Sequence, residues 1–74
     1  MDEMNGGWLP IETAPVGKVV MTKIDDESGE RNEQPLVKSG NLWFFPDRSM
    51  YVYYRPTHWR ELTAVEIAIG VAKS

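Results

Sequence analysis

His58 is the only histidine of the chain, and histidine is the residue best suited to acid–base chemistry near neutral pH. A catalytic triad would also need a hydroxyl nucleophile within hydrogen-bond reach of the imidazole and a carboxylate to orient the ring. Thr57 is adjacent, but neighbouring side chains on an extended segment point to opposite sides. We therefore interpret His58 as a structural residue, and we predict that the protein is not an enzyme.

Two other catalytic patterns are incomplete. Glu12 lies in an N-terminal arm, far in sequence from Glu61 and Glu66, which precede or begin an expected C-terminal helix. Carboxylates there have a simpler role, because they favour the positive end of the helix dipole. The glycine pair at residues 6–7 is not followed by the lysine of a phosphate-binding loop. The sequence therefore predicts no cofactor.

Residues 25–33, DDESGERNE, gather carboxylates around a glycine. An EF-hand calcium loop needs a glycine at position six and a glutamate at position twelve, whereas counting from Asp25 places Glu30 and Leu36 there. We therefore predict an exposed acidic loop without a metal. Contact with a basic partner stays open as an alternative, through Asp25, Asp26, Glu27 and Glu30.

The segment 43–60 interleaves aromatic side chains with three arginines. In its 50–55 run, strand alternation places Tyr51, Tyr53 and Arg55 on one face. Solvent-facing aromatic side chains on a sheet can stack on bases. They equally suit a protein interface, where tyrosine and arginine are enriched. Because the chain is acidic overall, we favour a protein partner, with nucleic acid as the alternative.

Composition limits what can stabilise the fold. The 74 residues form one domain at most and contain no cysteine, which excludes disulfides and thiolate zinc sites. The formal net charge is −3, and the acids concentrate in the first half: residues 1–33 sum to −5 and residues 34–74 to +2. No apolar run is long enough to span a bilayer, and the start lacks the pattern of a secretion signal. We expect a cytoplasmic protein, with a homo-oligomer left open.

The elements follow from side-chain periodicity. β-branched alternation predicts a strand over 18–24, and two short runs, 34–38 and 42–45, predict a hairpin around the turn at 39–41. Residues 50–55 carry the strongest strand signal of the chain. Pro35 is expected at a strand start or a sheet edge, because proline donates no hydrogen bond to a ladder.

The C-terminal segment changes to a helical period. Thr63 and Glu66 match a capping box, so we predict a helix over 63–72. Its apolar stripe is expected to cover the sheet and comprises Leu62, Val65, Ile69 and Ala72. With residues 1–7 disordered, residues 8–74 form a single α+β domain: a small twisted antiparallel sheet of three or four strands, with one C-terminal helix packed on a face.

Two sequence blocks resemble a family of small bacteriophage and prophage proteins of unknown function. The first is WLPIETAP at residues 8–15, and the second is PTHW at residues 56–59, with a lysine-bearing strand start and Trp43 between them. The resemblance covers about residues 8–62 and implies a phage or prophage origin with a cytoplasmic accessory role. The chain departs from the family where Arg60-Glu61-Leu62 replaces a proline-rich tail.

The physical reading of both blocks is structural. Trp8 and Trp59 are expected to pack from the two ends of the chain into one small core. Glu12 and His58 are their polar members, and we predict a hydrogen bond between them. Together with Trp43 these residues are the expected anchors of the fold.

Overall fold

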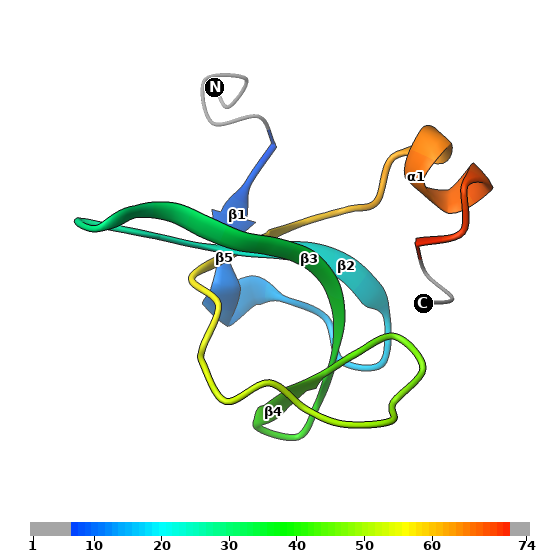
Figure 1. Cartoon of the computed structure of the whole chain (residues 1–74), viewed down its shortest axis with the longest axis horizontal. Helices are drawn as coiled ribbons and strands as arrows, with labels where there is room; N and C mark the ends of the chain where they lie inside the picture. The colour runs from blue at the N-terminus through cyan, green and yellow to red at the C-terminus, as the bar shows by residue number, and fades with distance from the viewer. Residues whose placement is uncertain (1–6, 72–74) are drawn as a thin grey trace.

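The computed structural model describes residues 7–71. The N-terminus predicted to be disordered, residues 1–7, falls outside this range except for Gly7, and so does the predicted helix end at Ala72. Within it, five antiparallel strands form one sheet in the order β1-β5-β2-β3-β4 (Figure 1). The predicted α+β class is confirmed, with one strand more than the upper estimate. The elements are β1 (Leu9–Pro10), the 3-10 helix η2 (Ile11–Thr13), β2 (Val19–Asp26), β3 (Gly29–Ser39), β4 (Leu42–Phe44), β5 (His58–Arg60) and α1 (Ala64–Ala68).

A long hairpin of β2 and β3 dominates the sheet, and it corrects the prediction of an acidic loop. The strand predicted at 18–24 is confirmed but continues to Asp26, and β3 already begins at Gly29. Gly29 adopts a φ of 104° directly after the turn, and Arg31 pairs with Asp26 across the ladder at 2.9 Å. A two-stranded ribbon beyond the core tolerates polar side chains on both faces, so its strands lack the alternation that sequence patterns detect.

A β-bulge interrupts this ladder. Thr22 pairs with Gln34 but Ile24 pairs with Arg31, so β3 carries one extra residue opposite Lys23. Asn32 there adopts the left-handed conformation, with a φ of 58°, which asparagine tolerates better than most residues. Among the described strands, β4 pairs with β3 only from Val37 onward. At Pro35 the side of β3 away from β2 is therefore a sheet edge. This suits proline, which has no N–H to donate to a neighbouring strand.

The segment 50–55 is the clearest failure of the strand prediction. The hairpin of β3 and β4 forms as expected around Gly40, but the following segment makes one isolated bridge, between Phe44 and Tyr51. Val52 N–H adds a hydrogen bond to the Trp43 carbonyl at 2.9 Å, after which the chain bends towards β5. Because β4 is three residues long, this segment has no partner along which a ladder could continue.

β5 was not anticipated as a strand, since three residues are too few to show alternation. It lies between β1 and β2 and pairs Leu9 with Trp59 and Pro10 with His58. The two sequence blocks therefore become neighbouring strands. The Glu12–His58 hydrogen bond is absent, however: Glu12 is exposed, and the polar link between the blocks runs from Trp59 Nε1–H to Thr13 Oγ1 at 2.9 Å.

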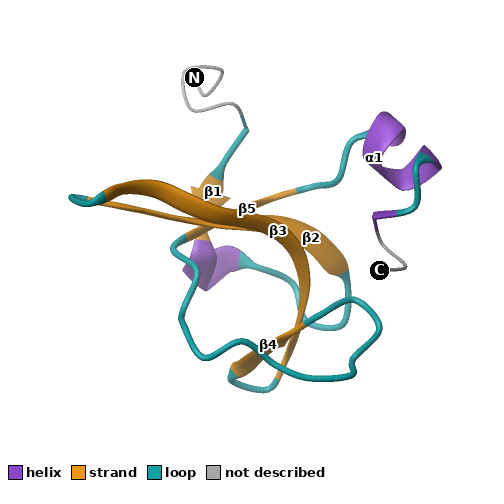
Figure 2. Cartoon of the chain, viewed as in Figure 1, coloured by secondary structure: helices purple, strands orange, loops and turns teal. Residues whose placement is uncertain are grey.

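The core lies on one face of the curved sheet. Val20, Leu36, Trp43 and Trp59 are buried together, so two of the expected anchors, Trp43 and Trp59, lie in the core. Partly buried side chains close this core from η2 and from the chain around β4, and they are Ile11, Ala14, Phe45 and Val52. Figure 2 shows η2 and the long connection to β5 on this same side of the sheet.

α1 forms the predicted capping box but does not cover the sheet. Thr63 Oγ1 accepts from Glu66 N–H at 3.1 Å, and the Glu66 carboxylate accepts from Thr63 N–H at 2.8 Å. The helix buries none of its residues; Val65 and Ile69 are 68% and 70% exposed, and Figure 1 shows α1 apart from the strands. Gly70, with a φ of 90°, follows its end.

The attachment of α1 to the sheet is electrostatic. Arg60 of β5 donates two hydrogen bonds to the Glu66 carboxylate, at 3.0 and 2.8 Å. These bonds, with the Thr63 amide, lower the pKa of Glu66 from 4.5 to about 2. A carboxylate with a lowered folded-state pKa stabilises the fold above its unfolded pKa, and this stabilisation is lost as the pH falls through the folded value.

We predict that α1 keeps its capped conformation at pH 5 and loses it between about pH 4.5 and pH 2. The amide chemical shifts of residues 63–69, followed by nuclear magnetic resonance during an acid titration, measure the midpoint. Glu66→Gln removes the transition, whereas Glu61→Gln, whose carboxylate pairs with Lys18 instead, leaves it in place. A midpoint near the ordinary glutamate value would contradict the role of Arg60.

We also predict that Thr13→Val destabilises the domain by about 1–3 kcal/mol, because it leaves the buried Trp59 N–H without an acceptor. Glu12→Gln, one residue away on an exposed side chain, changes the unfolding free energy by less than about 0.5 kcal/mol. Urea unfolding followed by circular dichroism compares the two variants. Equal losses would restore a structural role for Glu12.

Candidate binding surface

Three aromatic rings and one methionine side chain lie next to one another at β4 and the segment that follows it. We call these four residues the aromatic surface, and they are Phe44, Met50, Tyr51 and Tyr53. The Phe44 and Tyr51 ring centroids are 5.8 Å apart and those of Tyr51 and Tyr53 are 5.4 Å apart, both in edge-to-face geometry. Met50 is 52% exposed, Tyr51 40% and Tyr53 86%. Neighbouring exposed aromatic and apolar side chains of this kind are typical of an interaction surface.

Local structure explains why these rings face outward. The bridge at Tyr51 and the Val52 hydrogen bond fix the segment against β4, and Val52 packs on the core. Alternation then turns Tyr51, Tyr53 and Arg55 away from the core, as the sequence predicted, although the segment is not a strand. Tyr54 faces the other way and its hydroxyl hydrogen-bonds to the Gln34 amide on β3.

Two hollows are lined by these tyrosines, and a third adjoins one of them. A hollow of about 440 Å³ lies between the tyrosines and Phe45, Met50 and Gln34, and it is largely apolar. A second, of about 280 Å³, lies on the side of Trp43 and ends at Arg55. A third, of about 330 Å³, shares Trp43, Asn41 and Arg55 with the second and extends to Lys38. The second and third hollows therefore form one trough that starts at aromatic rings and ends at two cations.

The basic side chains divide into two groups. Lys18, Lys23, Arg31 and Arg60 each have a carboxylate within 4 Å. Within residues 7–71, the basic side chains without an ion pair are Lys38, Arg48 and Arg55. Lys38 lies on β3, Arg48 lies in the turn that follows β4, and Arg55 lies in the segment that leads to β5. Of these three, Arg55 lies beside the exposed tyrosines, and Lys38 lines a hollow that Arg55 shares.

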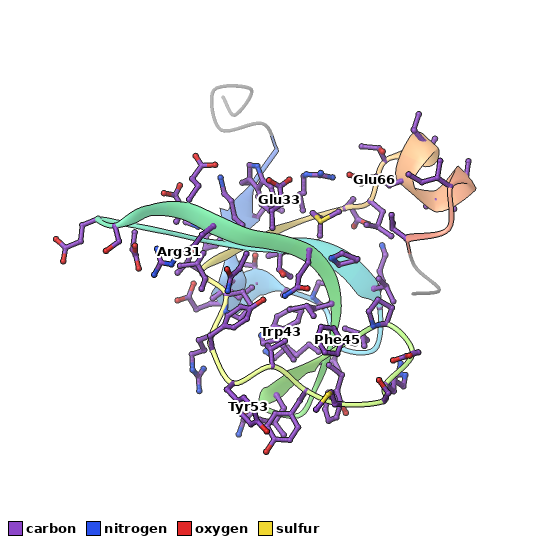
Figure 3. All side chains as sticks on the ribbon, viewed as in Figure 1. Arg31, Glu33, Trp43, Phe45, Tyr53 and Glu66 are labelled. Carbon is purple, nitrogen blue, oxygen red and sulfur yellow. The ribbon has the colours of Figure 1, made fainter. Side chains whose placement is uncertain are left out.

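The acidic residues of the hairpin form a separate site, and three cations neutralise part of its charge. Of the five carboxylates in residues 25–33, four are in ion pairs, and Glu27 is the exception among the described contacts. The guanidinium of Arg31 lowers the pKa of Asp26, chiefly through their hydrogen bonds. Figure 3 shows Arg31 on the projecting hairpin, well away from Tyr53. The predicted binding residues therefore occupy two distant surfaces.

Trp8 does not enter the core and instead covers cations on the opposite face of the sheet. Its ring centroid lies 4.5 Å from Lys23 Nζ and 5.1 Å from the Arg60 guanidinium carbon. The Lys23 side chain is 7% exposed, and its ammonium lies 3.3 Å from Glu30 and 3.7 Å from Asp25. Sequence reasoning missed this buried lysine, because a lysine in an alternating strand indicates solvent exposure.

The surroundings of His58 do not form a catalytic triad. Its Nδ1 lies 2.8 Å from Thr57 Oγ1, closer than expected for neighbours, because Thr57 lies in a bend before β5. That hydroxyl already accepts from the Asp25 amide at 2.8 Å and lies near the Lys23 carbonyl. In the described part of the chain no carboxylate hydrogen-bonds to the ring, and residues 7–71 contain no cluster of three metal-ligating side chains.

No protein-family model, curated protein or solved structure matches this chain. No helix of the described residues is long and apolar enough to cross a membrane. The function must therefore be argued from the surfaces described above.

We predict that Trp8→Ala exposes Lys23 and raises its acetylation rate by about tenfold or more, since Trp8 covers an ammonium that is 7% exposed. Mass spectrometry after brief treatment with acetic anhydride measures the rate at each lysine. Lys38, unpaired and remote from Trp8, is the internal control and keeps its rate. Rapid acetylation of Lys23 in the unaltered protein would contradict its burial.

Proposed function

We propose that the protein is a non-enzymatic interaction module, encoded by a phage or prophage, that binds a host or phage protein in the host cytoplasm. The observation that carries this proposal is the aromatic surface, where Tyr51 and Tyr53 are exposed beside hollows large enough for side chains. Tyrosine, methionine and arginine are the residue types enriched at protein interfaces.

The phage origin rests on the resemblance of the two end blocks. An accessory protein of this kind would act by occupying a surface of its partner, for example in a defence or transcription complex. Such inhibition needs no chemistry, in keeping with a His58 whose contacts are those of a structural residue. The expected consequence is that activity is lost by changing exposed residues that leave the fold intact.

Nucleic-acid binding is the second candidate, and one observation favours it. Arg55 lies beside the tyrosines and Lys38 lines the adjoining hollow, and neither is in an ion pair, as phosphate contacts would require. Against it, the Tyr51 and Tyr53 rings meet at 76°, whereas successive stacked bases are parallel, and the whole chain carries −3. Phosphate contacts would also give a steep salt dependence, which a protein partner does not require.

We predict that a photo-crosslinking amino acid at position 53 captures a defined protein in living host cells. The same amino acid at position 27, exposed at the hairpin tip, is the matched control and captures it much less. Adding Tyr51→Ser, which removes the neighbouring ring, abolishes the crosslink at position 53. Equal capture at both positions contradicts the proposal, and recovery of nucleic acid at position 53 favours the second candidate.

A further inference from the structure

We infer that the partner presents an extended acidic peptide segment with one large apolar side chain, and that this segment lies along the trough from the tyrosines to Lys38. This inference rests on the proposed function and specifies the chemistry of the partner. It differs from the expectation drawn from net charge, because an acidic protein would by itself suggest a basic partner.

Charge complementarity is the first argument. Lys23, Arg31 and Arg60 pair with four of the five hairpin carboxylates, so the hairpin offers a basic partner less free charge than its five acids suggest. Lys38 and Arg55 line the trough and have no ion pair within residues 7–71. Glu12 also lines it, and its carboxylate would repel an acid placed beside it. The carboxylates of the segment are therefore expected at Arg55 and Lys38 rather than beside Glu12.

The shape of the trough is the second argument. Its aromatic end, about 280 Å³, is lined by Trp43, Tyr51 and Tyr53 and has room for one large side chain. Its cationic end, about 330 Å³, adjoins the first through Asn41 and Arg55. A ligand that reaches both ends must therefore place an apolar group and an anionic group within a few residues of each other in an extended conformation.

Free backbone groups are the third argument, and they favour a peptide over an oligonucleotide. Residues 53–55 lie outside every strand, and in the described structure their amides and carbonyls make no backbone hydrogen bond. Their sequence nevertheless continues the strongest strand signal of the chain. An extended peptide can hydrogen-bond to these free groups through its own amides and carbonyls. A nucleic acid has no backbone amide to donate.

The test uses the full chain, labelled with ¹⁵N, and four probes of matched length. The first is an acidic peptide of Asp, Glu and Ser with one central Phe; the second replaces the Phe with Ser. The third replaces every acid with Lys, and the fourth is an oligothymidylate. Titrations followed by amide chemical shifts, at low and moderate salt, give affinities and map the contacted residues.

We expect the acidic Phe peptide to bind best and to shift residues 38–43 and 51–55. Arg55→Glu weakens it by about tenfold or more and improves binding of the lysine peptide. Arg48→Glu makes the same charge change at an exposed, unpaired arginine outside the trough, and it leaves the affinity within about twofold. Both arginines are exposed, so neither change is expected to unfold the domain.

Several results would overturn the inference. The lysine peptide or oligothymidylate could bind the unaltered protein more tightly than the acidic Phe peptide. The amide shifts could be confined to residues 25–33, or be absent at 51–55 with every probe. The two arginine changes could also weaken binding equally. Self-association of the chain through 51–55 would overturn it as well, since a second copy would then be the occupant. The proposed function fails separately, when the crosslink at position 53 captures no protein in cells.

Discussion

Burial of Trp43 and Trp59 against one face of the curved sheet is the constraint on which the rest of the structure depends. A chain of 74 residues without cysteine has little other apolar volume from which to build a core. Closing that core requires Val52, and Pro56 behind it is also buried. Because these two residues point inward, Tyr51, Tyr53 and Arg55 point outward. Packing of the core thus fixes the orientation of the aromatic surface.

The other face of the sheet is also covered, because β2 is buried along both faces. Val20 and Thr22 face the core, whereas Met21 and Lys23 face away from it and yet remain buried. A lysine can be buried there because carboxylates from the hairpin and the ring of Trp8 surround its ammonium. α1, which the sequence predicted on one face of the sheet, buries none of its residues. The helix is consequently left to an electrostatic attachment at Arg60.

The sequence predicts the elements whose signals are local. Alternation over 18–24, the turn at Gly40 and the capping box of Thr63 each involve residues within a few positions of one another, and all three are confirmed. The errors concern pairing between distant segments. The 25–33 ribbon is a hairpin despite lacking alternation, and 50–55 is not a strand despite strong propensity, because a strand also needs a neighbour of sufficient length.

The candidate surface also combines features that depend on local sequence with features that depend on pairing between distant segments. Alternation correctly turns Tyr51, Tyr53 and Arg55 to one side, because that depends on local geometry alone. The availability of charge is not local: it depends on the register that brings Arg31 to Asp26 and Arg60 to Glu33. A formal count makes the chain an anion of −3, but the fold pairs most hairpin carboxylates and leaves Lys38 and Arg55 free. The charge beside the tyrosines is therefore that of the Arg55 cation, and for the partner proposed above this local charge matters more than the net charge of the chain.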